Sequence, residues 1–305
     1  MPVFNAERYL VDSISSILNQ SFKDFEIILI NDGSKDNSLN IIKKFKRLDK
    51  RIVLINNKSN RGLPKSINSG LRIAKGKYIA RMDADDISMP DRFLIQFNYL
   101  EEHRDIFLIG SSAEVIDENN NHIGSLIKYD NYRKIYRKLL DSNPLIHPSI
   151  MFRNEKILYR EKFKASEEYD FYLRLLSLGK HITNLPQKLI KYRVSKNSFV
   201  STAPNQRYFF EKAKQFYRQR TEKGKDEYNS FNLDEIKVEE KPNFDKNNLR
   251  AIIIIKLFDN QMTKVRENIF EYTKKYGLDK KMIMTYIISF LPIKLILKIR
   301  EILSV

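Results

Sequence analysis

The feature that most constrains the fold is an alternation of short apolar runs and amphipathic stretches over residues 1–130. The run Phe25–Ile30 is apolar on both faces, as a strand buried inside a parallel sheet has to be. Similar patterns predict strands over 52–55, 77–82 and 106–109, and helices after Asn5, over 34–47, over 63–74 and after 89–91. Strands separated by helices indicate βαβ units and a parallel sheet.

Carboxylates follow two of these predicted strands at the point where each strand ends. Asp32 follows the strand at 25–30, and the segment Asp83–Asp86 follows the strand at 77–82. Ligands of open parallel sheets bind beyond the carboxyl ends of the strands. We therefore expect Asp32 and Asp83–Asp86 to converge in space.

The segment Asp83–Asp86 holds three carboxylates, which repel one another unless a cation compensates them. Mg²⁺ or Mn²⁺ suits such oxygen ligands and typically takes further ligands from a substrate diphosphate. The competing interpretation is a helix start decorated with acids, which the helix dipole favours. The residues alone leave both interpretations open.

Four further residues have a functional and a structural interpretation. Asp32 either accepts hydrogen bonds from a ligand or caps the next helix. Glu167 and Glu168 begin an amphipathic helix predicted over 166–178, where acids are common, but a carboxylate there is also a candidate general base. The position of His147, between Ile146 and Pro148 in an apolar stretch, favours a structural role.

The sequence pattern changes near residue 204, from mixed elements to helices. Before it we predict a hairpin turn at 117–121, a helix over 130–140 and an extended stretch over 146–152. After it we predict helices over 205–223 and 247–276, joined by a polar stretch. This organisation predicts a domain over residues 1–204 and a helical extension over 205–305.

Composition removes several classes of function. The chain has no cysteine, which excludes disulfides, Cys-ligated metal sites and a cysteine nucleophile. A net charge of +17 favours an anionic partner and keeps a nucleic-acid-binding or anionic-surface-binding protein as an alternative. The charge is spread along the chain, however, and no P-loop, dinucleotide fingerprint or zinc-finger spacing occurs, so we expect no nucleic acid partner. No signal peptide or membrane span is apparent, which predicts a cytoplasmic protein.

An ordered set of motifs resembles the inverting family-2 glycosyltransferases that build bacterial surface glycans. The set covers roughly residues 1–200. Its members are Met1–Asn5, Leu18–Gln20, Asn31–Ser34, Asn60–Gly62, Asn68–Gly70, Arg81–Asp86, His147–Ser149, Glu167–Asp170 and Tyr192–Arg193. The resemblance implies the GT-A fold: an α/β, Rossmann-like, mainly parallel sheet flanked by helices, here with a helical C-terminal extension.

The resemblance also implies roles for individual residues. Asp85 is the main expected ligand of Mg²⁺ or Mn²⁺, and Asp83 holds the ribose or the metal. Glu168 takes the place of the catalytic base, while His147 and Glu167 lie on the acceptor side. The residues expected to bind the nucleotide-sugar donor, besides Asp83, are Pro2, Val3, Phe4, Asp32, Arg61 and Lys65.

Three positions depart from the family pattern. The base is more often Asp, so Glu168 adds a methylene, and Ser195 replaces a common His near the metal. Met1 already stands at the Pro-Val-aromatic-Asn stretch, which several strand residues usually precede. The first strand is therefore expected to be largely missing and the chain destabilised, through truncation or a start assigned to an internal Met.

The expected function is metal-dependent, inverting transfer of one sugar from a nucleotide-diphosphate sugar, a UDP-sugar for preference. The expected acceptor is a hydroxyl of a surface glycan, and a lipid-linked glycan is one form that this acceptor could take. The chain has no tryptophan and so lacks the Gln-x-x-Arg-Trp motif of processive synthases, which favours single addition. An inactive or truncated relative is the alternative.

Residues 274–305 combine many apolar side chains with seven basic and two acidic ones, a net charge of +5. This composition suits a segment that lies in the interface of an anionic membrane, on the inner face in a cytoplasmic protein. The same apolar residues could equally pack on the catalytic domain or on a second subunit. Both interpretations stay open from the sequence.

Overall fold

The computed structural model describes residues 1–128, 132–194, 205–234, 236, 244–277 and 279–303. The chain folds into two compact units. Unit 1 comprises Met1–Ala113, Ile127–Tyr192 and Asn205–Val238, and unit 2 comprises Glu114–Leu126, Arg193–Pro204 and Glu239–Val305. The division of the chain into functional domains at residue 204 stays a prediction.

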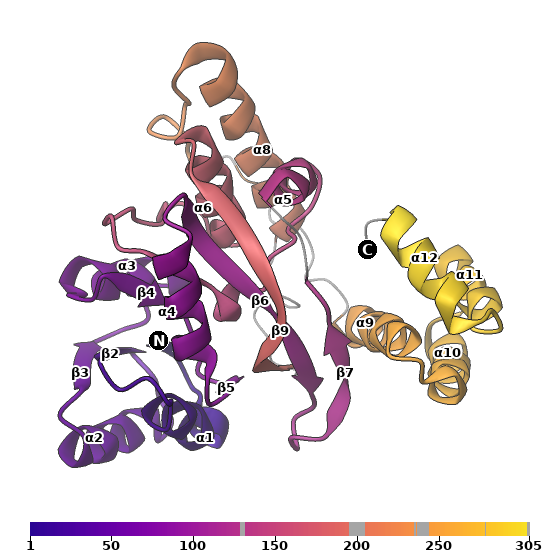
Figure 1. Ribbon diagram of the computed structural model, residues 1–305, viewed down its shortest axis with the longest axis horizontal. Helices are drawn as coiled ribbons and strands as arrows, with labels where there is room; N and C mark the ends of the chain where they lie inside the picture. The colour runs from indigo at the N-terminus through magenta and orange to yellow at the C-terminus, as the bar shows by residue number, and fades with distance from the viewer. Residues whose placement is uncertain (129–131, 195–204, 235, 237–243, 278, 304–305) are drawn as a thin grey trace. The chain divides into compact units, whose positions relative to one another are not determined.

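Unit 1 begins with a parallel sheet of three strands in the order β1-β2-β3 (Figure 1). The strands are β1 (Pro2–Val3), β2 (Ile27–Asp32) and β3 (Ile52–Asn57). The connecting helices are α1 (Glu7–Leu18) and α2 (Ser38–Leu48), and α3 (Leu63–Ile73) follows β3. Parallel pairing of all three strands confirms the prediction of βαβ units. The first strand is present but only two residues long.

A second sheet runs in the order β4-β8-β6-β9-β5, and β7 pairs with β6. Its strands are β4 (Tyr78–Ala80), β5 (Ile87–Ser88), β6 (Ile106–Ile116), β7 (His122–Leu126), β8 (Met151–Arg153) and β9 (His181–Arg193). The pairs β4–β8, β6–β8 and β5–β9 are antiparallel. The expectation of parallel pairing is therefore wrong here, because β8 arrives from a distant part of the sequence and separates β4 from β6.

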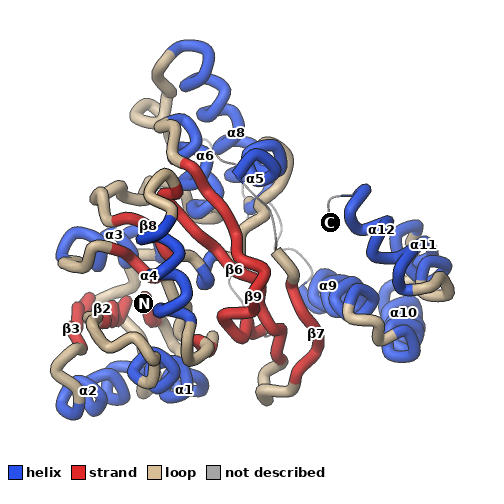
Figure 2. Tube along the Cα trace, in the orientation of Figure 1, coloured by secondary structure: helices blue, strands red, loops and turns tan. Residues whose placement is uncertain are grey.

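The helices of unit 1 that follow β5 complete the layers around the sheets (Figure 2). They are α4 (Arg92–Glu102), α5 (Tyr132–Leu139), α6 (Glu167–Ser177), α8 (Gln206–Lys223) and the 3₁₀ turn His147–Ser149. The predicted helices over 130–140, 166–178 and 205–223 correspond to α5, α6 and α8. Aromatic side chains of α6 and α8 meet: the rings of the buried Tyr169 and the half-buried Phe210 are stacked, with their centroids 3.9 Å apart.

Buried polar side chains fix the segment that follows β4. Arg92 on α4 is fully buried and donates to the carbonyls of Arg81 and Ile150, at 2.7 and 3.2 Å. Gln20, also fully buried, donates to the carbonyl of Met89 at 2.7 Å. Since buried polar groups are costly unless they are hydrogen-bonded, these contacts hold the stretch from residue 81 to residue 89 in one conformation.

Unit 2 contains β7 and a helical bundle with its own apolar core. The helices are α9 (Phe244–Phe258), α10 (Met262–Tyr276), α11 (Lys280–Ile288) and α12 (Ile293–Leu303). The single helix predicted over 247–276 is wrong: it breaks between α9 and α10, where Asn260 has φ 59. Asparagine tolerates this left-handed conformation better than most residues, because its short side chain bonds locally.

Candidate functional site

The loops after β1 and β2 are joined by hydrogen bonds. The backbone N–H of Asn5 donates to Ser34 Oγ at 3.1 Å, and that of Glu7 donates to Asp36 Oδ2 at 2.9 Å. In the other direction, the N–H of Asn37 donates to Glu7 Oε2 at 2.8 Å. These bonds fix the carboxyl ends of two adjacent parallel strands, where ligands of such sheets bind.

Asp32 supports the loop after β3. Its Oδ1 accepts from Asn57 Nδ2 at 2.8 Å and from the N–H of Arg61 at 3.0 Å, and its Oδ2 accepts from the N–H of Gly62 at 3.0 Å. The residue is 4% exposed. Both carboxylate oxygens are thus engaged within the protein. Contact of Asp32 with a nucleotide base stays a prediction.

The other residues predicted to bind the donor lie near the same edge. Val3 is buried in the apolar core and offers a ligand only its backbone, whereas Phe4 is 48% exposed. Pro2 and Lys65 are half-buried, and Arg61 is exposed. Contact of these five residues with a nucleotide-sugar donor stays a prediction.

The first acidic cluster consists of Asp83, Asp85 and Asp86, directly after β4. One carboxylate oxygen from each lies within 4.8 Å of the others. Asp83 forms an ion pair with Arg81, whose side chain is 5% exposed. Burial raises the pKa of the nearby Tyr192 hydroxyl, and Asp86, Asp83 and Asp85 raise it further.

This donor set fits the cation that the sequence implies. Hard carboxylate oxygens are the ligands that Mg²⁺ and Mn²⁺ prefer. Arg81 forms an ion pair with Asp83, and the negative charge of Asp86 acts on both Arg81 and Arg92. Asp83 and Asp85 are the half-buried members of the cluster, while Asp86 is buried. Those two carboxylates are therefore the ones that would hold the metal.

The second cluster consists of His147, Glu167 and Glu168, whose potential ligand atoms also lie within 4.8 Å of one another. His147 Nε2 and the Tyr159 hydroxyl are 2.9 Å apart. Asn143 Nδ2 donates to Glu168 Oε1 at 3.3 Å. The structure thus brings together the predicted base and both predicted acceptor-side residues.

Helix α6, which carries the two glutamates, is preceded by a residue with an unusual backbone conformation. The residue before it, Ser166, is left-handed, with φ 54 and ψ 28. Its Oγ donates to the carbonyl of Gln206 at 3.3 Å. A left-handed conformation is strained for a residue other than glycine, and such strain persists only where surrounding contacts enforce it. The helix therefore starts with Glu167 and Glu168 in a fixed direction.

Charge links the two clusters. Burial raises the pKa of Glu167 and of Glu168, and the positive charge of Arg81 opposes the rise in both cases. Burial lowers the pKa of His147 well below its usual value, and Arg81 lowers it further. Asp83 also raises the pKa of both glutamates. The carboxylates after β4 and those at the start of α6 therefore share one electrostatic environment.

Sequence reasoning found the acids but did not assign roles to Arg81, Asn143 or Tyr159. One signal for Arg81 was available: residues two apart in an extended segment lie on the same face, so Arg81 and Asp83 could have been paired. Nothing local indicates that Asn143 and Tyr159 meet the glutamates. Ser195, the proposed departure near the metal, lies outside the described residues.

Comparison with known sequences gives one family. The sequence profile "Glycosyl transferase family 2" matches residues 1–161. An uncharacterised glycosyltransferase of Methanocaldococcus jannaschii is 37% identical over 67% of this chain and 72% of its own length. The O-antigen biosynthesis glycosyltransferase WbnJ of Escherichia coli is 34% identical over 67% and 81%, respectively. The amylovoran biosynthesis glycosyltransferase AmsE of Erwinia amylovora is 30% identical over 63% and 73%.

Comparison of structures gives the same fold. The crystal structure of S. aureus TarS 1–349 in complex with UDP has a TM-score of 0.54 and 17% identity, covering 92% of this chain and 91% of that one. The complex of TarS 1–349 with UDP-GlcNAc has a TM-score of 0.54 and 16% identity, covering 94% and 77%. These similarities show the fold, and they confirm the α/β, GT-A assignment.

Replacement of Asp32 and of Asp85 should affect the stability of the protein differently. We expect Asp32→Ala to lower the free energy of unfolding by about 1–3 kcal/mol, because two loop N–H groups lose their acceptor. Asp85→Ala should lower it by less, because Asp85 is half-buried, whereas Asp32 is buried and both of its carboxylate oxygens accept hydrogen bonds. Urea unfolding in metal-free buffer, followed by circular dichroism, measures both. An Asp85→Ala variant as unstable as Asp32→Ala would contradict this account of the cluster.

Proposed function

The chain belongs to glycosyltransferase family 2, and we propose that it transfers a single sugar from a UDP-sugar to a hydroxyl of a surface glycan, with a divalent metal and with inversion. The observation that carries the proposal is the pair of acidic clusters that share the charge of Arg81. One cluster has the chemistry to hold a metal and a diphosphate, and the other contains a carboxylate suited to proton abstraction.

The donor side rests on the residues after β4. Asp83 and Asp85 would hold Mg²⁺ or Mn²⁺, and the bound cation would supply positive charge beside the departing diphosphate. Structures of the same fold are complexes with UDP and UDP-GlcNAc, which supports a uridine nucleotide as the donor. Phe4, at the edge of the sheet and half-exposed, is available to lie against the base.

The acceptor side rests on Glu168. Its carboxylate takes the proton of the acceptor hydroxyl, and the acceptor oxygen attacks the anomeric carbon from the face opposite the diphosphate. The bond between that carbon and the diphosphate oxygen breaks, and its electron pair leaves with the diphosphate. Asn143, which donates to Glu168, orients the carboxylate. Attack from the opposite face inverts the anomeric configuration.

The acceptor class follows from relatives rather than from the site. Relatives act in O-antigen and amylovoran biosynthesis, and both products are surface polysaccharides. The half-buried His147 and Glu168 and the buried Glu167 would line the acceptor side. A lipid-linked glycan is the form of this acceptor that would give a purpose to the apolar and basic surface of α11 and α12, described next.

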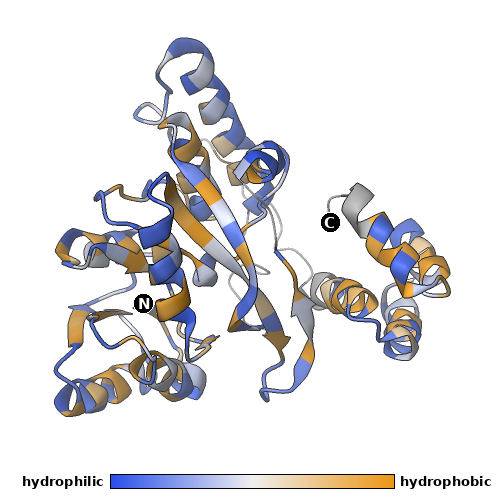
Figure 3. Cartoon of the chain, viewed as in Figure 1, coloured by the Kyte–Doolittle hydropathy of each residue, from blue (hydrophilic) through white to orange (hydrophobic). Residues whose placement is uncertain are grey.

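Hydrophobic and hydrophilic residues alternate along helices α11 and α12 (Figure 3). Lys280, Lys281, Lys294 and Lys298 are exposed. The exposed large apolar residues of these helices and of the turn between them are Ile283, Met284, Tyr286, Ile287, Phe290, Leu295 and Leu297. Among the described residues, no helix has the length and apolar character needed to cross a bilayer. We propose that this surface lies in the interface of an anionic membrane, where the acceptor would be presented.

Loss of Asp85, the proposed metal ligand, should strongly reduce turnover. We expect Asp85→Asn to reduce kcat/KM by at least about hundredfold, because the charge beside the diphosphate is lost. Asp91→Asn, at an exposed acid in the same segment, should keep wild-type turnover. UDP release from a UDP-sugar and an acceptor glycan measures both, with EDTA and then Mn²⁺ or Mg²⁺ added. Full activity in EDTA would refute the role of the metal.

Loss of the base should spare donor binding. We expect Glu168→Gln to lower kcat by ~10²–10⁴ while the Kd for UDP stays the same, because shape is kept and basicity lost. Glu168→Asp should retain more activity. In the wild type, the raised pKa of Glu168 moves the acidic loss of kcat to higher pH than an ordinary glutamate would give. A variant that loses UDP binding but keeps kcat would make Glu168 a donor-site residue.

Removing exposed apolar side chains should weaken membrane binding. We expect the double variant Met284→Ser/Ile287→Ser to lose vesicle affinity by about tenfold or more, since each side chain gains ~1.5–3 kcal/mol on full burial. The matched control is Leu48→Ser, an exposed apolar residue of α2. Sedimentation with anionic and with neutral vesicles gives the affinities. Equal binding by the wild type and the double variant would instead indicate packing within the protein or on a second subunit.

A further inference from the structure

Tyr159 lies in the loop between β8 and α6 and reaches the second acidic cluster. The residue is 3% exposed, and its hydroxyl lies 2.9 Å from Nε2 of His147. Its ring is stacked on Phe171 of α6, with the centroids 4.4 Å apart and the planes at 7°. Among the residues that the structure describes, this hydroxyl and the His147 ring have no hydrogen-bond partner other than each other. The sugar transfer proposed above gives Tyr159 no role.

The loop that carries Tyr159 is held from two sides. The backbone N–H of Tyr159 donates to Asn68 Oδ1 at 2.8 Å, and Asn68 Nδ2 donates to the Tyr159 carbonyl at 2.9 Å. The next residue, Arg160, donates to both carboxylate oxygens of Asp226, at 2.7 and 2.9 Å. Loops are usually more mobile than the elements they connect. These contacts instead give the Tyr159 hydroxyl a fixed position.

The imidazole of His147 is fixed as well. His147 begins the 3₁₀ turn His147–Ser149, which Ser149 Oγ braces by donating to the carbonyl of Ile146 at 2.7 Å. The ring lies edge-on to the ring of Tyr172, with the centroids 6.3 Å apart and the planes at 88°. The 2.9 Å contact between the imidazole and Tyr159 therefore joins two groups whose positions are set independently.

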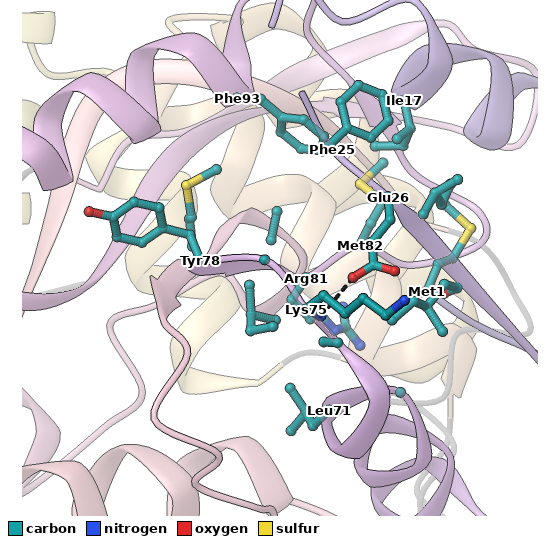
Figure 4. Close-up of a pocket in the computed structure, with 18 of the residues that line it drawn as sticks. Met1, Ile17, Phe25, Glu26, Leu71, Lys75, Tyr78, Arg81, Met82 and Phe93 are labelled. Atoms are coloured by element: carbon teal, nitrogen blue, oxygen red, sulfur yellow. Dashed lines mark hydrogen bonds between the residues drawn. The ribbon is translucent and has the colours of Figure 1, made fainter. Parts of the chain in front are cut away.

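The imidazole of His147 is uncharged. Burial lowers the pKa of His147 well below its usual value, and the positive charge of Arg81 lowers it further. The Arg81 side chain is 5% exposed, and Figure 4 shows it among the residues that line a cavity of about 650 Å³. Water screens such a buried charge only weakly. A neutral imidazole has one N–H and one nitrogen lone pair, and its hydrogen bonds decide which nitrogen holds the proton.

The Tyr159 hydroxyl makes that choice. Burial raises the pKa of Tyr159, so the hydroxyl keeps its proton. A buried O–H is costly without an acceptor, and among the described residues Nε2 of His147 is its only one. Nε2 therefore accepts, and the ring proton lies on Nδ1. The reverse bond would leave the Tyr159 O–H without an acceptor, beside a Tyr172 hydroxyl that already lacks a partner within the described part of the chain.

The position of the ring proton matters for the neighbouring glutamates. A ring nitrogen of His147 lies within 4.8 Å of carboxylate oxygens of Glu167 and Glu168. With the proton on Nε2, the lone pair of Nδ1 would be a second base that competes with Glu168 for the proton of the acceptor. With the proton on Nδ1, the free nitrogen of His147 is a hydrogen-bond donor, and the carboxylate has no such competitor.

We propose that Tyr159 is a positioning residue that fixes the tautomer of His147: its hydroxyl donates to Nε2, and the N–H at Nδ1 is offered to an oxygen of the acceptor glycan. Glu168 alone then takes the proton of the acceptor hydroxyl. The role toward the acceptor rests on the proposed sugar transfer, whereas the tautomer does not.

Nuclear magnetic resonance of isotope-labelled histidine nitrogens reads the tautomer near neutral pH. The chain has four histidines, and the signals that disappear in His147→Asn are those of His147. We expect the wild-type ring to be neutral and protonated on Nδ1. Tyr159→Phe keeps the stacking on Phe171 and should move at least about half of the proton to Nε2. The matched control is Tyr172→Phe, which removes a hydroxyl without a partner among the described residues and should leave the signals unchanged.

Kinetics test the role toward the acceptor. We expect Tyr159→Phe to raise KM for the acceptor at least about fivefold, because only part of the molecules then hold the competent tautomer. The Kd for UDP should stay the same, and Tyr172→Phe should keep the wild-type KM. In a His147→Asn background, Tyr159→Phe should change KM by less than about twofold, because an amide has no tautomer to fix.

The spectra and the kinetics are decided separately. A proton on Nδ1 in the wild type that moves in Tyr159→Phe, but not in Tyr172→Phe, supports the proposal. A wild-type ring that is charged or protonated on Nε2 overturns it, even if Tyr159→Phe fails to fold. An equal rise in KM with and without His147 overturns the role toward the acceptor, because Tyr159 would then act without the imidazole. Absence of wild-type turnover refutes the sugar transfer and that role with it, while the spectra still decide the tautomer.

Discussion

The buried guanidinium of Arg81 is the group on which the arrangement of the acids depends. Burial alone would lower the pKa of Arg81, but the Asp83 carboxylate raises it above its usual value, so the charge persists. Its positive charge favours the ionised forms of Glu167 and Glu168 and disfavours protonation of His147. Carboxylates from the end of β4 and the start of α6 can therefore lie in one site. Arg92 donates a hydrogen bond to the Arg81 carbonyl. The position of Arg81 is therefore fixed through its backbone as well as through its ion pair with Asp83.

The parts of the fold that the sequence predicts are those set by local patterns. The apolar runs at 25–30 and 52–55 and the helices beside them indicate β2 and β3, whose parallel pairing follows from βαβ geometry. The second sheet depends on β8, which joins β4 and β6 across about seventy and forty residues of sequence, respectively. No local pattern carries that pairing. The break at Asn260 was missed because helical periodicity continues on both sides of it.

The residues of the candidate site likewise include some that local sequence predicts and some that only the folded structure brings together. Asp83 and Asp85 are predictable because they follow a buried strand, whereas Glu168 needed the resemblance to a family, since acids are common at helix starts. Asn143 approaches Glu168 from twenty-five residues away, and Asn68 Nδ2 donates to the Tyr159 carbonyl from ninety-one residues away. Such contacts exist only after the chain has folded. The proposed metal ligands are thus encoded in a short motif, whereas the surroundings of Glu168 are assembled by tertiary structure.

The left-handed conformation of Ser166 has a consequence for how this enzyme could change under selection. Ser166→Gly would relieve backbone strain at the start of α6, and relief of such strain is a common route to a more stable protein. The same change would remove the Oγ bond to Gln206 and widen the range of directions open to Glu167 and Glu168. Selection for heat resistance alone would therefore tend to erode the alignment of Glu168, the proposed base, and a lineage that depends on turnover has reason to retain the strained serine.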